Sequence, residues 1–151
     1  MTLRYLLDTT IVSLPVSKMP DPVVVARLEA SGPECAIAAP VWHELTYGCE
    51  RLPHGKRRRS LEAYLRDVVR GSFPNLPYDE AAATWHGKER ARLEAQGRPA
   101  PFVDGQIAAV AHVHGLVLVT INEKDFAAFE GLRVENWSKL RASRKESRKG
   151  R

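Results

Sequence analysis

The stretch Pro101–Phe126, which reads PFVDGQIAAVAHVHGLVLVTINEKDF, constrains the fold of this chain more than any other. Its first half places apolar residues at the spacing of one helical face. Pro101 suits the first turn of that helix, and Gly115 suits the position just past its end. The run Leu116–Val119 is then apolar on both faces, which is typical of a central strand in a parallel sheet covered on both sides. The stretch therefore predicts a helix, a tight stop and a buried parallel strand.

Short apolar runs and helical patterns alternate through the rest of the chain. Leu3–Leu7 and Cys35–Ala39 are predicted as strands, Leu132–Trp137 as a last edge strand, and Phe73–Tyr78 as an irregular segment or a short edge strand. Start and stop signals predict a short helix after Asp8 and further helices over 22–28, from residue 40, over 56–70 and from 79 to about 96. This alternation predicts an α/β fold with a central, mainly parallel sheet flanked by helices.

The size and composition of the chain exclude several classes of protein. Its 151 residues suffice for one domain with its own core. No apolar run approaches the length of a membrane span, and the N-terminus lacks the pattern of a secretory signal, so we expect a cytoplasmic protein without membrane contact. Cys35 and Cys49 lack the spacing of a metal site or a disulfide framework, so we expect them to be reduced packing residues.

The positive charge of the chain is concentrated at its end. Residues 139–151 carry seven Lys or Arg and one acid, a net charge of +6, so residues 1–138 sum to −1 out of the +5 of the whole chain. The end segment has too few apolar residues to build a core. We therefore predict a folded domain over residues 1–138 and a disordered basic tail over 139–151, which serves either as a solubilising end or as a weak attraction for nucleic acid.

Acidic and amide side chains follow the predicted strands. Asp8 comes after the first strand, Glu44 lies in the helix after the second, and Asn122 and Asp125 come after the strand at 116–119. The ends of parallel strands share one edge of a sheet, so these residues can converge there. Asp104 joins them only if the N-terminus of its helix lies at that edge, which we do not expect of an ordinary crossover helix and which the spacing leaves open.

Carboxylates gathered at one edge repel each other, and burying them without compensation is unfavourable. Mg²⁺ or Mn²⁺ relieves the repulsion, because these ions prefer oxygen ligands and bind through a few carboxylates and substrate phosphates. Such a metal activates water for attack on a phosphodiester. His112 and His114 point to opposite sides of their predicted helix, which argues against a zinc site. Taken singly, each acid also suits a helix cap or a plain turn.

Four motifs carry a family resemblance. They are LLDTT (Leu6–Thr10), HEL-x-YG (His43–Gly48), D-x-x-IAA-x-A (Asp104–Ala111) and LVT-x-N-x-x-DF (Leu118–Phe126), followed by GLRVENW (Gly131–Trp137). With these motifs in family order and at family-like separations, the sequence resembles the PIN-domain ribonucleases, most closely the VapC-like toxins of bacterial toxin–antitoxin pairs.

The resemblance implies a PIN-like fold and a metal-dependent endoribonuclease that hydrolyses RNA phosphodiester bonds. It implies that Asp8, Glu44 and Asp104 hold Mg²⁺ or Mn²⁺ in one pocket. Asn122 falls at a fourth position that is Asp or Asn in the family, and Asp125 lies close by as a possible outer ligand. All five residues are therefore predicted to be catalytic.

The same resemblance implies partners. VapC-like toxins form symmetric homodimers and are silenced by a cognate antitoxin whose tail enters the acidic groove, so we expect both here. Thr10 stands where these toxins usually carry Asn, which alters a hydrogen bond near Asp8. Several aromatic residues are candidates for contact with a partner, namely Trp42, Tyr47, Phe73, Trp85 and Trp137.

A basic segment follows the HEL-x-YG motif. Residues 51–70 carry seven Lys or Arg against Glu62 and Asp67. We interpret them either as a solvated helix face or as contacts to RNA phosphates, and the candidates for RNA binding are Arg51, Arg57, Arg58 and Arg59.

Two other functions fit parts of the sequence. A phosphatase or phosphotransfer domain also gathers acids at strand ends, but Asp8-Thr9-Thr10 lacks the second Asp of a D-x-D start. An RNA- or partner-binding PIN-like module without catalysis is supported only by Thr10 and Asn122. A titration with divalent metal and RNA separates these alternatives from the nuclease.

Overall fold

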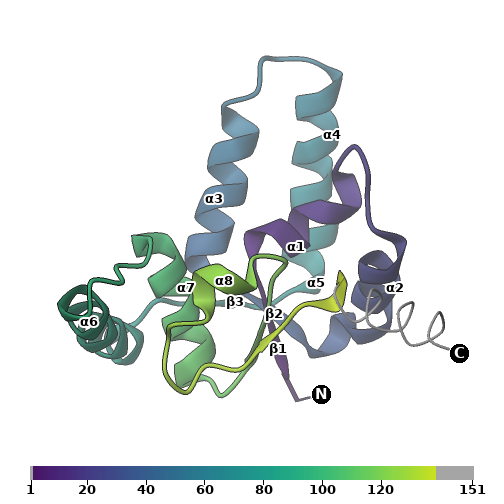
Figure 1. The fold of residues 1–151 in the computed structure, drawn as a ribbon. Helices are drawn as coiled ribbons and strands as arrows, with labels where there is room; N and C mark the ends of the chain where they lie inside the picture. The colour runs from purple at the N-terminus through teal and green to yellow at the C-terminus, as the bar shows by residue number, and fades with distance from the viewer. Residues whose placement is uncertain (1, 139–151) are drawn as a thin grey trace, which may run out of the picture.

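The computed structural model describes residues 2–138. Five parallel strands form one sheet in the order β3-β2-β1-β4-β5, with β1 at its centre (Figure 1). The strands are β1 (Tyr5–Leu7), β2 (Cys35–Ala38), β3 (Asn75–Leu76), β4 (Val117–Val119) and β5 (Val134–Glu135). The basic tail predicted for residues 139–151 lies outside the described residues, so its disorder and the domain boundary at residue 138 stay predictions.

Helices flank the sheet, as the alternating pattern predicts. They are α1 (Thr9–Ser13), η1 (Leu14–Val16), α2 (Pro22–Ser31), η2 (Gly32–Glu34), α3 (Ala39–Glu50), α4 (Lys56–Tyr64), η3 (Leu65–Val69), α5 (Arg70–Ser72), α6 (Glu80–Ala95), α7 (Phe102–Val113) and α8 (Glu123–Phe126). Figure 1 shows α3 and α4 projecting together from the rest of the fold as a hairpin. Within residues 2–138, no helix combines the length and the apolar character that a membrane span requires.

The strand register decides which side chains meet. Strands β1 and β2 consist of buried residues, whereas the short strands β3 and β5 at the two edges are less buried. Parallel pairing places Leu7 of β1 opposite Val119 of β4. The next residue, Asp8, donates its N–H to the carbonyl oxygen of Val119 at 2.9 Å. Asp8 and Thr120 therefore leave the sheet side by side at its carboxyl edge.

Helix α7 ends as the sequence predicts. Gly115 has a φ of +65°, and two hydrogen bonds close the end of the helix, from Gly115 N–H to His112 O at 3.1 Å and from Leu116 N–H to Ala111 O at 2.9 Å. This pair of bonds is a Schellman motif, which favours glycine at the left-handed position. Gly71, in contrast, has no positive φ, and the predicted helix over 56–70 continues to Ser72 through the π-helical turn η3.

One expectation about α7 is wrong. The N-terminus of this helix does lie at the carboxyl edge of the sheet, and Asp104 in its first turn faces the other acids. The physical reason is the direction of the chain. Because α7 leads through a tight turn into β4, it runs back against the strand direction and must begin at the edge where the strands end.

A buried histidine fixes the start of α7. The ring of His86 on α6 is 4% exposed, and a hydrogen bond of 2.9 Å joins its Nδ1 to the hydroxyl of Tyr78. The other side of the ring lies so close to Gly105 that a Cβ there would be 2.2 Å from His86 Nε2. Burial, and then the charge of Arg90, lower the pKa of His86, so the neutral ring is favoured. Gly105 thus lets α7 approach α6 with Asp104 one residue away.

We expect Gly105→Ala to lower the free energy of unfolding by about 1–3 kcal/mol, because the added methyl group overpacks a ring that is held on both sides. Gly87→Ala on α6 is the matched control. An added Cβ at Gly87 meets nothing within 4 Å, and alanine in a helix is favoured over glycine by about 0.5–1 kcal/mol. Urea denaturation measures both variants, and a Gly105→Ala protein as stable as Gly87→Ala would contradict the role given to this contact.

Candidate active site

Asp8 is the most constrained acid of the site. It is the N-cap of α1, and its Oδ1 accepts the Thr9 N–H at 2.8 Å. Its Oδ2 accepts two hydroxyl groups, from Thr120 at 2.8 Å and from Thr10 at 3.2 Å. Thr10 therefore supplies a side-chain hydrogen bond to Asp8. These three bonds fix the carboxylate in one orientation.

Two threonines of the site were not among the predicted residues. Thr120 is fully buried and also accepts the N–H of Asn122 at 3.0 Å. Thr9 donates its hydroxyl to Glu44 Oε2 at 2.7 Å, so it links the Glu44 carboxylate to the Asp8 cap. A signal for Thr120 exists in the sequence, since a polar residue directly after a buried parallel strand lies at the edge where ligands bind. No comparable signal marks the hydroxyl of Thr9.

The acids interact electrostatically across the carboxyl edge. Burial raises the pKa of Asp104 to about 6, and the charges of Asp8, Asp125 and Glu44 add to this effect. The pKa of Asp8 is also raised, first by burial, although hydrogen bonds from Thr120, Thr9 and Thr10 lower it. Asp125 acts on Asp8 in the same direction as burial. The structure thus brings together Asp8, Glu44, Asp104 and Asp125, from four different elements of the chain.

Asn122 takes a different place. It is exposed and occupies the N-cap position of α8, but its side chain makes no capping hydrogen bond there. Its backbone N–H contacts Thr120, which in turn contacts Asp8. Asn122 is therefore connected to the acids through its backbone, and the role of its side chain stays a prediction.

The donor set at this edge suits a hard cation. The acidic donors are carboxylate oxygens, and the pKa values of Asp8 and Asp104 are raised first by burial and then by the charges of neighbouring acids. Within residues 2–138, no group of three or more Asp, Glu, His or Cys side chains is arranged to hold a metal ion by itself. Mg²⁺ does not require a closed cage, because it keeps several waters and binds through one or two carboxylates and substrate phosphates. The residues present therefore fit such an ion.

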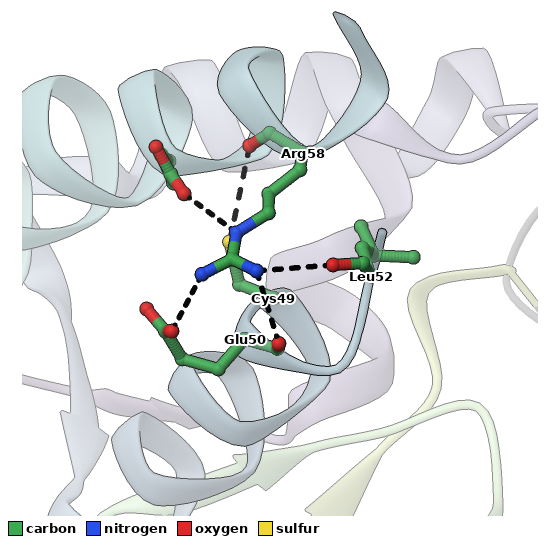
Figure 2. A network of polar contacts seen from close by, with 5 residues as sticks. Cys49, Glu50, Leu52 and Arg58 are labelled. Atoms are coloured by element: carbon green, nitrogen blue, oxygen red, sulfur yellow. Dashed lines mark hydrogen bonds and ion pairs between the residues drawn. The ribbon is translucent and has the colours of Figure 1, made fainter. Parts of the chain in front are cut away.

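The four arginines predicted to bind RNA are not equivalent. Arg58 is turned into the α3–α4 hairpin, where its guanidinium donates to the carbonyl oxygens of Glu50 and Leu52 at 3.2 and 3.1 Å (Figure 2). It also donates to the carboxylates of Glu50 and Glu62 at 2.6 and 2.9 Å. A guanidinium bound in this way stabilises the hairpin and is poorly placed for a phosphate. Arg51, Arg57 and Arg59 are exposed.

The structure also places the histidines, aromatic residues and cysteines that the sequence analysis considered. His112 stacks on Trp85, with ring centroids 4.6 Å apart, while His114 is exposed, so the two do not form a zinc site. Trp137 is 1% exposed and belongs to the core, which corrects its assignment as a candidate partner contact. Cys35 and Cys49 are free and buried, as predicted. Of the aromatic candidates, Tyr47 is the exposed one.

Comparisons with known proteins place this fold and site in a class. A family model of the PIN domain matches residues 5–132. The tRNA(fMet)-specific endonuclease VapC of Shigella flexneri is 34% identical over 137 residues, which cover 90% of this chain and 99% of that protein. The structure of FitAcB from Neisseria gonorrhoeae superposes with a TM-score of 0.81 at 30% identity, over 88% of this chain and 97% of that one.

A second structure supports the same class. DNA-bound VapBC from Salmonella typhimurium superposes with a TM-score of 0.76 at 29% identity, over 90% of this chain and 99% of that one. The chain therefore belongs to the PIN-domain family. Within that family it is similar to the VapC ribonucleases over nearly their whole length.

The raised pKa of Asp104 yields a test of stability. The Asp104 carboxyl keeps its proton up to a pH of about 6 in the folded state, whereas in the unfolded chain it ionises near its ordinary pKa of 3.8. The free energy of unfolding therefore falls as the pH rises from about 4 to 6. Asp104→Asn removes this loss. In EDTA at pH 7 we expect the variant to be about 1–2 kcal/mol more stable than the wild type, after allowance for solvent screening.

Urea denaturation at pH 4 and pH 7 measures this difference, which should become small at pH 4. Asp67→Asn is the control, because a hydrogen bond from Arg66 lowers the pKa of Asp67 and its neutralisation should not stabilise the fold. Wild type and Asp104→Asn with the same stability at pH 7 would show that burial and the neighbouring acids do not destabilise the ionised Asp104 carboxylate appreciably.

Proposed function

We propose that this protein is a metal-dependent endoribonuclease that acts as the toxin of a toxin–antitoxin pair. The observation that carries the proposal is the convergence of Asp8, Glu44 and Asp125 on Asp104, whose charges add to the effect of burial and raise the pKa of the Asp104 carboxyl to about 6. Neutralised by a cation, such a cluster is suited to the cleavage of an anionic phosphodiester. The similarity to VapC ribonucleases supports RNA as the substrate.

Asp8, Glu44 and Asp104 would hold Mg²⁺ or Mn²⁺. When bound, the ion supplies an activated water and neutralises charge on the phosphate under attack. The chain supplies orientation. Thr120 and Thr10 hold Asp8 in place, and Thr9 links Glu44 to the Asp8 cap, so hydrogen bonds orient two of the three proposed ligands. Asp125 and Asn122 are proposed as outer residues of the same site.

The proposed substrate is a transfer RNA in the first instance. The Shigella flexneri relative is a tRNA(fMet)-specific endonuclease, which makes tRNA(fMet) the first RNA to test. Arg51, Arg57 and Arg59 are exposed around the α3–α4 hairpin and are proposed contacts to RNA phosphates. Arg58 is left out of this group because protein atoms occupy its guanidinium.

Partners follow from the same similarity. The related structures FitAcB and VapBC support a cognate antitoxin for this chain. The homodimer stays a prediction, to be checked by light scattering on an inactive variant. We also keep the proposal of a cytoplasmic location, since RNA is the proposed substrate and both cysteines are free thiols.

The decisive test is cleavage of tRNA(fMet) by purified protein with Mg²⁺ or Mn²⁺. We expect cleavage that EDTA stops, and we expect Asp8→Asn and Asp104→Asn to lose at least about a hundredfold in rate, because each removes the charge of a proposed ligand while keeping a side chain of the same size. Thermal unfolding should show that both variants remain folded.

Asp67→Asn, which changes an exposed acid on η3, should cleave like the wild type. Expressed in cells, wild type should arrest growth and Asp8→Asn should not. Cleavage that persists in EDTA would exclude the metal-dependent mechanism. A phosphatase or a non-catalytic module would release no RNA fragments with any metal.

A further inference from the structure

A cavity lies beside the acids. A cavity of about 400 Å³ is lined from α1, α3 and α7, and Thr9 and Glu44 belong both to this cavity and to the acidic site. The remaining lining includes His43, Tyr47, Arg51 and Gln106, none of which holds or orients a carboxylate of the site. A ligand in this cavity would therefore lie next to the phosphodiester that the acids are proposed to cleave.

Tyr47 gives the cavity a flat aromatic wall. Its side chain is 59% exposed, although large apolar side chains are mostly buried in this domain. Arg51, one helical turn later, places its guanidinium carbon 5.3 Å from the centre of the Tyr47 ring. Planar aromatic and guanidinium groups are the surfaces on which proteins stack unpaired nucleobases. An exposed pair of this kind beside a phosphodiester-cleaving site indicates a surface for a base.

The cavity also offers polar groups and space. His43 and Gln106 carry donors and acceptors that can pair with the edge of a base. Gly48 lines the cavity as well, and a Cβ built on it meets nothing within 4 Å. The helix therefore leaves the space in front of Gly48 open, and a larger side chain there would enter the cavity without disturbing the core.

We propose that this cavity is a nucleoside subsite, which holds one unpaired base of the RNA stacked on Tyr47 while the adjoining phosphodiester lies at the acids. The proposal rests on the proposed function, since it takes RNA as the substrate of the same site. It assigns to Tyr47 and Arg51 the recognition of a single-stranded nucleotide, and to His43 and Gln106 the preference among bases. A nuclease with this subsite cuts where a loop or an unpaired end presents a base.

Binding to a short single-stranded RNA tests the subsite without cleavage. A series of RNAs is made in which one abasic ribose replaces the nucleotide at each position in turn. Fluorescence anisotropy measures the affinity of each RNA for two inactive proteins, the single variant Asp104→Asn and the double variant Asp104→Asn with Tyr47→Leu. We expect one position at which loss of the base weakens binding about tenfold when Tyr47 is present. In Tyr47→Leu the same abasic change should weaken RNA binding little further, because the aromatic ring on which that base stacks has already been removed.

Three further variants sharpen the result. Tyr47→Trp should restore binding, since it keeps an aromatic face. Gly48→Leu should weaken binding like Tyr47→Leu while the protein unfolds at no lower temperature, because it fills the cavity from a position with free space. Met19→Ala, which removes an 88% exposed side chain outside the cavity, should bind like its parent. In the active protein, Tyr47→Leu should raise KM about tenfold and change kcat less.

The outcomes separate this proposal from the function on which it rests. Losses on abasic substitution that are equal with and without Tyr47 would overturn the subsite, even if the wild type cleaves RNA. A change of molecular mass in Tyr47→Leu, with unchanged RNA affinity, would overturn it in favour of a contact between copies of the chain. Base-dependent binding through Tyr47 in a wild type that cleaves no RNA would keep the subsite and reject the nuclease.

Discussion

The parallel pairing of β1 with β4 is the constraint on which the rest of the structure depends. It sets Leu7 opposite Val119, and the chain therefore releases Asp8 and Thr120 at the same edge of the sheet. Helix α7 returns to that edge and adds Asp104, with Gly105 packed against the ring of His86. Like charges are brought together by backbone geometry and core packing, which resist the repulsion between them.

Such an arrangement exchanges stability for function. A carboxyl whose pKa is raised to about 6 destabilises the folded protein at neutral pH, and nothing in the packing of Asp104 requires a charge there. The hydrogen bonds of Thr120, Thr10 and Thr9 oppose the effect at Asp8 and at the same time fix its direction. Preorganised acids of this kind favour a divalent cation and, with it, the phosphate of a substrate.

Much of this architecture could be predicted from the sequence. The Schellman end of α7, the cap at Asp79 and the buried strands follow from local chemistry, since glycine, proline and apolar runs act over a few residues. The place of Asp104 was within reach of the same reasoning, because a helix that leads through a tight turn into a parallel strand must begin at the edge where the strands end. The turn of Arg58 into the hairpin depends on how α4 packs against the end of α3, and the bond from Thr9 to Glu44 joins two helices that are separated by a strand and another helix in the chain.

The central claim is that the acids repel one another because they are placed to share a cation. Carbon-13 NMR of the side-chain carboxyl groups, with the Asp104 signal assigned through Asp104→Asn, measures how far burial and the neighbouring acids together raise the pKa of Asp104. Titrated in EDTA, Asp104 should show an apparent pKa near 6. In saturating Mg²⁺ that pKa should fall by at least about one unit, since a bound cation favours the carboxylate. An Asp104 that titrates near its ordinary value of 3.8 in EDTA, or at the same pH with and without Mg²⁺, would contradict the account.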